Sequence, residues 1–553
     1  MNKTLLPILA LLCISVVSVA QPTVGLLSYQ PSKTFNGYNL MYPHNQPTVY
    51  LLDNCGEIVN TWEDDNNFRP GNMAYLRPDG TLVKTKRDAV VTDDAIWAGG
   101  GGEFVEIRDW DNSLMWSFEL NDSTSRLHHD IAPMPNGNIL LLAWELKTAD
   151  EAIFAGRDTA TLSQGKIWPD YIIEIDPSTN QIVWEWHTWD HLIQDHDPSK
   201  ANYGVVEDHP ELIDLNWDTS DGHPDWMHGN AIDYNPELNQ IILSVPTFSE
   251  VWIIDHTTNT AEAASHTGGL SGRGGDLMYR WGNPATYRSG TIDDQKLFFP
   301  HDIHWVDEFV DFSFPQYGKI AVFNNRVGAD FSTANVFNPP WDMYSWSYTL
   351  DNNVFGPANF DITITHPTPT DLYSTGLSSV QLLPNGNTLI LSGRKGYVFE
   401  ITPDDEIVWE YKTPLINGNP ASQGDTLAIN NNLTFRFNRY PDYFSAFDGK
   451  DLSQKGWIEN NPDTTFCDII LPVGEVFKNY NLKLYPNPAY DMVVIEWEAG
   501  MYSDFEVFDI LGRRLSGFSA SGGRKYLDVS GWGEGIYFIR VDGVVMEKLV
   551  ISR

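Results

Sequence analysis

The sequence is poor in positive charge. It holds 35 lysines and arginines against 74 aspartates and glutamates, which gives a formal net charge of −39. Nucleic acids and anionic membranes are bound largely through Lys and Arg, so this balance argues against both as partners. It does not imply a cationic substrate, because an acidic surface often serves solubility alone.

Long hydrophobic runs are also scarce. The first one, residues 5–17, follows Lys3 and precedes the small residues Ser18-Val19-Ala20, a pattern that predicts a signal peptide over residues 1–20 and a mature chain that starts at Gln21. This run is too short to span a bilayer. No later stretch is apolar enough to do so, and we therefore predict an exported chain without a transmembrane segment.

Cysteine and the common cofactor motifs are almost absent. Of three cysteines, Cys55 and Cys467 would remain in the mature chain; export permits a disulfide between them, but the sequence leaves the pairing open. There is no Gly-x-x-x-x-Gly-Lys phosphate loop and no His-Glu-x-x-His helix motif. The glycine-rich run at residues 268–275 lacks the dinucleotide fingerprint and predicts a flexible loop.

Short strands joined by turns recur along the chain. Residues 48–62 predict a hairpin whose second strand ends in Trp62, and residues 103–118, 171–186 and 397–411 repeat this unit. Five units are clear and a sixth is blurred, with no convincing helix between them. Antiparallel units that each end in Trp are typical of propeller blades. We predict an all-β propeller at residues 48–465, preceded by an N-terminal segment at residues 21–47.

Long insertions interrupt the repeats at residues 149–170, 192–225 and 331–372. In repeat proteins, such insertions usually crowd one face and shape the binding site there.

The pattern changes after residue 465. Residues 466–480 read as a linker, and the short alternating strands of residues 481–553 predict a small β-sandwich. Its Tyr485-Pro486-Asn487-Pro488 start and its Gly535–Val541 strand resemble the C-terminal sorting domains of the Bacteroidetes type IX secretion system. The resemblance implies a partnership with that machinery, passage through the outer membrane, usually with loss of this domain, and delivery to the cell surface or medium.

Histidines recur at one position of the repeat. Superposing the Pro-Asn-Gly turns aligns Asn72, His129, His228, His301 and Ser378, six residues before the turn proline in three of the blades. In a propeller this position begins the innermost strand, so the side chains would converge on one central spot. A single histidine is more often structural, but three at one repeat position favour a shared site.

A second position carries charge. Eight residues after the turn glycine, at the far end of an inner strand, lie Asp88, Glu145, Arg326 and Arg394, and the blade with a longer turn places Pro246 there. Two arginines beside the histidines could bind an anion. Taken singly, each is as often a surface ion-pair residue.

Clustered histidines allow three kinds of chemistry. They suit a metal site, acid–base work near neutral pH, or nucleophilic attack on an electrophilic group. Nothing in the sequence favours a given metal, and arginines nearby disfavour a cation and favour an anionic substrate. We therefore predict neither a metal nor a cofactor at this site.

Several segments together resemble the bacterial arylsulfate sulfotransferase family over roughly residues 37–450. They are Tyr50–Asp53 with Thr61-Trp62, His128–Asp130 with Pro135–Asn138, Trp189–Leu192, Asp225–Asn230, Tyr279–Pro284, His301-Asp302, Phe399–Asp404 and Arg439–Pro441. The resemblance implies a six-bladed propeller that moves a sulfuryl group from a phenolic sulfate ester to a phenol acceptor, without the nucleotide donor PAPS, through a sulfohistidine intermediate.

The same resemblance assigns roles to residues. His301 matches the nucleophile; His228 and the His128–His129 pair match supporting histidines, with His129 preferred on repeat position. The predicted catalytic residues are His301, His228, His129, Arg394 and Arg326, and the predicted substrate-binding residues are His128, Asn72, Ser378 and Trp281.

One departure from the family concerns an arginine. The family typically has Leu-Ser-x-Arg shortly after the motif that contains His228, whereas this chain has Leu243-Ser244-Val245-Pro246. Proline cannot donate to a sulfuryl oxygen. Either Arg326 or Arg394 supplies the charge, or activity is altered or lost.

Other functions fit parts of the pattern. An aryl sulfate hydrolase would use water in place of the phenol. A surface propeller that binds glycans or sulfated compounds would keep the histidines as relics, and Pro246 favours it. The repeated Trp motifs also suggest a quinoprotein dehydrogenase, but its larger blade count and repeat pattern are not seen.

Overall fold

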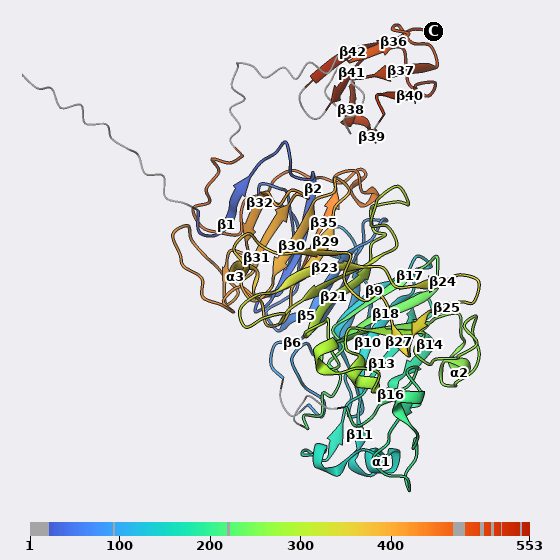
Figure 1. The fold of residues 1–553 in the computed structure, drawn as a ribbon. Helices are drawn as coiled ribbons and strands as arrows, with labels where there is room; N and C mark the ends of the chain where they lie inside the picture. Colours follow the sequence, from blue (N-terminus) through green and yellow to red (C-terminus); the bar gives the residue numbers. More distant parts are fainter. Residues whose placement is uncertain are drawn as a thin grey trace, which may run out of the picture. The chain divides into compact units, whose positions relative to one another are not determined.

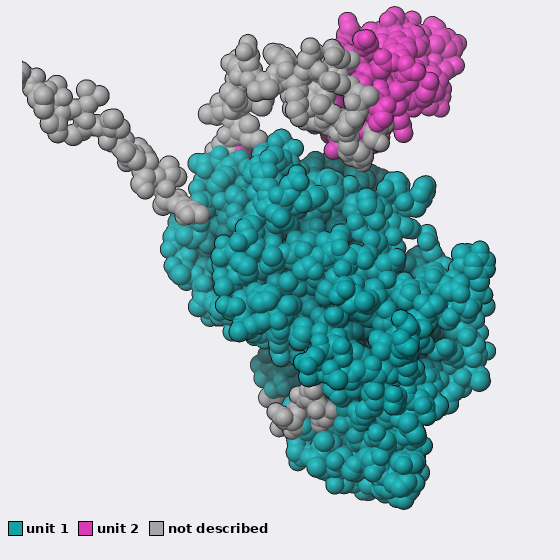
Figure 2. Space-filling view, in the orientation of Figure 1, with its two compact units in different colours: residues 1–466 teal, residues 467–553 magenta. Residues whose placement is uncertain are grey.

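The computed structural model describes residues 22–91, 94–217, 222–467, 482–497, 503–509, 514–520, 522–541 and 545–553. The chain divides into two compact units, residues 1–466 and 467–553 (Figure 2). The predicted signal peptide at residues 1–20 lies outside the described residues, as does most of the predicted linker. Among the residues described, no helix has the length and apolar character needed to cross a membrane. Cys55 and Cys467 are both disulfide-bonded, a point that the sequence left open.

The first unit contains six antiparallel sheets of the blade type (Figure 1). From the innermost strand outward, they are blade 1 with β35 (Thr434–Pro441), β2 (Gly37–Pro43), β3 (Thr48–Leu52) and β4 (Ile58–Glu63); blade 2 with β5 (Phe68–Leu76), β6 (Leu82–Asp88), β7 (Phe104–Arg108) and β8 (Leu114–Glu119); blade 3 with β9 (Ser125–Pro133), β10 (Ile139–Glu145), β13 (Asp170–Asp176) and β14 (Gln181–His187); blade 4 with β17 (Ala231–Asn235), β18 (Gln240–Val245), β19 (Glu250–Asp255) and β20 (Tyr279–Trp281); blade 5 with β21 (Pro300–Trp305), β22 (Ile320–Asn324), β23 (Thr333–Phe337) and β28 (Ile362–Ile364); and blade 6 with β29 (Ser379–Leu382), β30 (Thr388–Ser392), β31 (Tyr397–Ile401), β32 (Ile407–Lys412) and β1 (Gly25–Tyr29).

The innermost strands form a closed ring. Each contacts the innermost strand of the next blade, from β35 through β5, β9, β17, β21 and β29 back to β35. The predicted six-bladed propeller is confirmed.

Strands from the two ends of the first unit pair to close the ring. β35, near the end of the unit, pairs with β2, and β1 adds an outer strand to blade 6. Both β1 and β2 lie in residues 21–47, which the sequence analysis set apart from a propeller at residues 48–465. That boundary is wrong, because these residues supply strands to two blades.

The repeated tryptophans link neighbouring blades. In five blades, a Trp on the outer strand donates its indole N–H to a turn or loop of the next blade: Trp62 to Asp109 O, Trp116 to Asn180 Oδ1, Trp186 to Gly275 O, Trp281 to Pro357 O and Trp409 to Asn54 O. Hydrophobic clusters fill the spaces between blades; the one between blades 2 and 3 contains Val83, Ile107, Leu141 and Ile173. The repeated Trp residues therefore join each of these five blades to the next one.

Short elements lie in the insertions and in other connections between strands, and in the described part of the chain they include helices that the sequence analysis did not predict. α1 begins after Thr148, whose hydroxyl accepts from Glu151 N while Glu151 accepts from Thr148 N, a capping box that favours a helix start. The helices are α1 (Ala149–Ala155), α2 (Thr260–Ala263) and α3 (Pro369–Leu372), and the short strands are β11 (Lys147–Thr148), β12 (Lys166–Ile167), β15 (Leu192–Ile193), β16 (Ile213–Asp214), β24 (Trp341–Asp342), β25 (Ser347–Tyr348), β26 (Leu350–Asp351), β27 (Val354–Phe355), β33 (Leu415–Ile416) and β34 (Asn419–Pro420).

The second unit has two sheets around a core of its own. The core includes Val493, Phe505, Ile539 and Leu549. One sheet contains β36 (Lys483–Tyr485), β37 (Met492–Glu496) and β40 (Arg524–Asp528); the other contains β39 (Arg514–Ala520), β38 (Ser503–Asp509), β41 (Gly535–Val541) and β42 (Val545–Ile551). The arrangement agrees with the predicted small β-sandwich.

Candidate functional site

The three register histidines belong to the innermost strands of blades 3, 4 and 5: His129 lies within β9 where its register with β10 shifts, His228 lies just before β17, and His301 is the second residue of β21. His129 and His228 have left-handed backbones, with φ of 50° and 57°, and Asn72 and Ser378 share this feature with φ of 101° and 93°. Such a backbone is costly for residues other than glycine and is held in place only by surrounding contacts. Four of the five residues at this repeat position therefore share the unusual backbone, and in the blade of His301 the positive φ falls on Phe299 and Asp302 instead.

These histidines meet in the centre of the ring. The rings of His129 and His228 are 4.6 Å apart at their centroids. Phe299 lies 5.8 Å from both His228 and His301, and Phe435 lies 6.1 Å from His129 and 6.2 Å from His301. The site thus combines three imidazoles with two phenyl rings.

His301 is held in one tautomer. Its Nδ1 lies 2.7 Å from Oδ1 of Asn325, whose Nδ2 donates to Ser374 O and to Leu377 O, both at 3.0 Å. These two donations orient the amide so that Oδ1 faces His301, and an amide oxygen only accepts. Nδ1 therefore carries the proton, and the lone pair of the neutral ring is on Nε2.

The charge state of His301 agrees with this. Burial lowers the pKa of His301 to about 3, with further lowering from His228 and Arg326 and an opposing contribution from the hydrogen bond to Asn325. A histidine with this pKa is neutral throughout the physiological pH range. A neutral imidazole with a fixed lone pair is a competent nucleophile.

His228 has the opposite preference. Burial lowers its pKa, but the carboxylate of Asp225, with Oδ2 2.6 Å from Nδ1, more than offsets this, so the pKa of His228 is raised above its usual value. The site therefore places a histidine that favours the cation beside one that is neutral. Such a pair separates the roles of acid and nucleophile.

His129 is buried and neutral, and its neighbour His128 supports it. Burial and the nearby His228 hold the pKa of His129 well below its usual value. Its Nδ1 is 3.0 Å from Nδ1 of His128, which stacks on Trp144 with a centroid distance of 4.0 Å. Gly100 covers His129 so closely that a Cβ there would lie 2.0 Å from Nε2. Of the pair, His129 is the member in contact with His228.

The predicted charged positions lie on the same face of the ring as the histidines. They end the second strand of each blade rather than the innermost strand, which corrects the sequence-based placement. Because neighbouring strands are antiparallel, the end of the second strand lies beside the start of the first. In blade 1 this position is held by His44, directly after β2; burial and then Arg87 lower the pKa of His44 to about 4.

Arg394 and Arg326 both approach the histidines. A Cβ placed on Gly376 would be 3.6 Å from a terminal guanidinium nitrogen of Arg394 and 3.8 Å from Cε1 of His301. Nε of Arg394 is buried and has no hydrogen-bond partner in the described part of the chain. Arg326 lies over Phe299 at 3.6 Å from the ring centroid, and its charge lowers the pKa of both His228 and His301.

The other residues at this repeat position, the end of the second strand, do not add positive charge. Glu145 pairs with Lys147 at 2.6 Å, and Pro246 starts the tight turn that closes when Ser249 N donates to its carbonyl. Arg326 and Arg394 therefore provide the cationic groups at this position of the ring.

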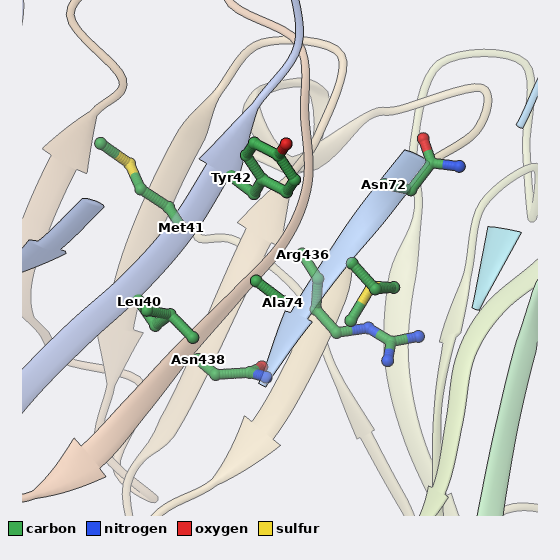
Figure 3. A pocket seen from close by; sticks show the side chains of 8 residues that line it. Leu40, Met41, Tyr42, Asn72, Ala74, Arg436 and Asn438 are labelled. Atoms are coloured by element: carbon green, nitrogen blue, oxygen red, sulfur yellow. The ribbon is translucent and has the colours of Figure 1, made fainter. Parts of the chain in front are cut away.

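Beneath the histidines, an arginine crosses the channel. Arg436, on β35, is paired with Asp130 Oδ2 at 2.9 Å and with Asp302 Oδ1 at 2.7 Å, and it also donates to the hydroxyl of Tyr75. A small pocket lies beside it where β2, β5 and β35 meet, with Asn72 and Arg436 among the lining residues (Figure 3). Paired and buried in this way, Arg436 links its own blade 1 to blades 2, 3 and 5 and forms a floor for the site.

Three predicted substrate-binding residues have other partners. Asn72 donates to Gly100 O at 3.0 Å, and the hydroxyl of Ser378 accepts from Gly393 N at 2.9 Å, so both hold loops that border the site. Trp281 is not brought to the histidines. It packs on Phe337 in the core and belongs to the series of Trp residues that link blades.

Sequence reasoning missed several residues of the site. They are His44, Asp225, Phe299, Asn325, Phe435 and Arg436. His44 could have been found by extending the repeat register to β2, and Asn325 directly precedes Arg326 in that register; Phe435 and Arg436 come from the strand that closes the ring and carry no repeat signal.

Comparisons with known proteins agree with this picture. The model of a family described as arylsulfotransferase matches residues 30–417, more than half of the chain, and that of a secretion system C-terminal sorting domain matches residues 483–552. The sorting domain indicates export to the cell surface or secretion. A comparison with curated proteins gave no match.

Solved structures similar to the chain include a streptogramin B lyase, the Dos1 propeller and a virginiamycin B lyase from Staphylococcus aureus. Their identities to the chain are 12%, 9% and 11%, with TM-scores of 0.33, 0.30 and 0.31. The matches cover 77%, 72% and 71% of this chain and 96%, 77% and 89% of those chains, respectively.

Proposed function

Because the chain belongs to the arylsulfotransferase family, we propose that it moves a sulfuryl group from an aryl sulfate ester to a phenol, with His301 as the carrier. The observation that carries this proposal is the fixed tautomer of His301. Asn325 holds the proton on Nδ1, and burial keeps the ring neutral, so Nε2 presents a lone pair to the site.

The reaction has two balanced half-reactions. In the first, Nε2 of His301 attacks sulfur, the sulfur–oxygen bond of the ester breaks with its electron pair on the phenolate oxygen, and protonated His228 gives a proton to that oxygen. In the second, neutral His228 takes the proton of the acceptor phenol, the phenolate oxygen attacks sulfur, and the sulfur–nitrogen bond breaks with its electrons returning to Nε2. A covalent intermediate divides one difficult transfer into two easier ones.

Cationic groups stabilise the charge that develops. By analogy with loose phosphoryl transfer, negative charge in the transition state spreads over the sulfuryl oxygens and the leaving phenolate. Arg394, with a buried Nε that lacks a partner, and Arg326 can donate to those oxygens. These two arginines would supply the positive charge that family members obtain from an arginine at the position of Pro246.

The phenyl rings of Phe299 and Phe435 suit an aromatic substrate. Both lie between the histidines at centroid distances near 6 Å, where an aryl ring could pack edge-to-face or offset. The proposed reaction needs no cofactor, since donor, carrier and acceptor are the ester, His301 and the phenol.

The proposal is tested with a chromogenic phenyl sulfate, with and without an added phenol. We expect release of the chromophore to depend on the phenol, with His301→Asn inactive and still folded. Release that is independent of the phenol would identify a hydrolase instead. No release from a folded parent protein would favour a binding propeller, the function that Pro246 suggests.

A further inference from the structure

A second group of histidines lies at the outer edge of the propeller, between blades 3 and 4. His191 follows β14, and His266 and Asp276 belong to the connection between β19 and β20. Nδ1 of His191 and Nδ1 of His266 each lie 2.7 Å from the same oxygen, Oδ1 of Asp276. One ligand atom from each of the three residues fits within 4.8 Å of the others.

The ring of His191 lies between two acceptors. Its Nε2 is 2.8 Å from the carbonyl of Ala263, and its Nδ1 faces the carboxylate of Asp276. A carbonyl and an ionised carboxylate both only accept, whereas a neutral imidazole has a single N–H. If the single N–H is on Nε2 and donates to Ala263, the lone pair of Nδ1 faces the carboxylate of Asp276, and a proton or a metal ion must lie between them.

The surroundings are those of a metal site. Ligating histidines usually donate their other N–H to a carbonyl or carboxylate, which fixes the tautomer, and His191 does this through Ala263. Two imidazole nitrogens and one carboxylate oxygen are ligands that zinc and similar ions prefer. The side chain of His266 is 60% exposed, so an ion can enter from solvent and a water can complete the coordination.

The local packing holds His191 in place before any ion binds. Its ring stacks on Trp186 with centroids 5.5 Å apart, and Trp186 donates to Gly275 O at 2.7 Å. A Cβ on Gly275 would lie 1.9 Å from Ala263 O and 2.6 Å from Nε2 of His191. Tetrahedral zinc would set nitrogen and oxygen about 3.3 Å apart, so both 2.7 Å contacts to Asp276 would widen, through movement of the exposed His266 and of the Asp276 side chain.

We propose that His191, through Nδ1, His266 and Asp276 bind a divalent transition-metal ion with the preferences of zinc. The ion would tie the insertion that follows β14 to the β19–β20 connection and so lock two neighbouring blades together. This proposal is independent of sulfuryl transfer, because the three residues take no part in the site around His301.

The test is Zn²⁺ binding to the metal-stripped protein, measured by calorimetry, with Co²⁺ absorption as a second readout of N/O coordination. We expect the parent to bind one equivalent that His266→Ala weakens by more than about 100-fold, since loss of an outer-shell contact alone costs about 10–100-fold. His209→Ala is the matched control: His209 is also exposed and lies 2.8 Å from Oε1 of Glu211, with no third ligand among the described residues. It should bind Zn²⁺ as the parent does.

The histidines of the channel could bind Zn²⁺ as well, so His301→Asn is titrated in parallel, alone and combined with His266→Ala. The equivalent that His266→Ala removes should persist in His301→Asn, and zinc should raise the Tm of His301→Asn more than that of the double variant. Equal binding by the parent and His266→Ala, or a parent that binds no Zn²⁺ and shows no Co²⁺ absorption band, would overturn the proposal.

Discussion

Replacing Asn325 by alanine tests how the site prepares its nucleophile. The amide accepts from Nδ1–H of His301 at 2.7 Å, and it is oriented by two backbone carbonyls. In the proposed first half-reaction, attack of Nε2 on sulfur gives the ring positive charge, and the bond to Asn325 becomes charge-assisted. A neutral bond contributes about 0.5–1.5 kcal/mol and a charge-assisted one about 1.5–3 kcal/mol. Only the gain on going to the transition state, about 1–1.5 kcal/mol, affects kcat, and its removal corresponds to a loss of about 5- to 13-fold.

The assay is steady-state transfer from a chromogenic aryl sulfate to a phenol, with Tm measured beside it. Asn335→Ala is the control, because Asn335 is equally buried in the same blade and bonds to Thr333 and Thr363 without touching a histidine. Both variants should lose stability, and only Asn325→Ala should lose turnover. If kcat of Asn325→Ala stays within about 3-fold of the control, the argument from the tautomer is wrong.

Three further predictions concern the charged and titratable side chains His228, Arg394 and Asp307. In the proposed mechanism His228, whose pKa is raised, is the acid, so the rate of the first half-reaction should fall as pH rises through that pKa. His228→Gln should lower kcat by about 10²–10⁴-fold and abolish this alkaline limb. Arg394→Ala should lower kcat by about 10²–10³-fold with Tm unchanged, and an unchanged rate would exclude its role in transition-state binding. Burial and then Glu237 raise the pKa of Asp307 to about 7. The stability that comes from protonated Asp307 is therefore present at low pH and lost as pH rises from about 4 to 7. Asp307→Asn should raise Tm at pH 8 more than at pH 5, and an equal shift at both pH values would contradict this direction of pH dependence.

Much of the fold follows from local sequence signals. Pro-Asn-Gly turns, alternating strands and outer-strand Trp residues predict blades, because each blade is a local antiparallel unit. The same register identifies His129, His228 and His301 at equivalent positions. Trp281 was given a functional role that its position in the Trp series explains better, since its indole N–H links blade 4 to blade 5.

The parts that escaped prediction depend on contacts between distant segments. β35 joins β2 across about 400 residues of chain, as the bond from Arg439 to Asn39 shows, and no local pattern marks such a closure. Arg436 and Phe435 enter the site only through it. Asn325 and Asp225 were missed for another reason: an amide or carboxylate that orients a histidine has no sequence signature beyond proximity in the fold.

The most direct test of the account is to find the sulfuryl group on the protein. The enzyme is mixed with an aryl sulfate in the absence of acceptor, quenched, digested and examined by mass spectrometry. We expect the mass of one sulfuryl group on the peptide that contains Phe299-Pro300-His301, and its loss when a phenol is added before the quench. An adduct on the peptide of His129 or of His228, or release of phenol without any adduct, would contradict the assignment of His301 as the carrier.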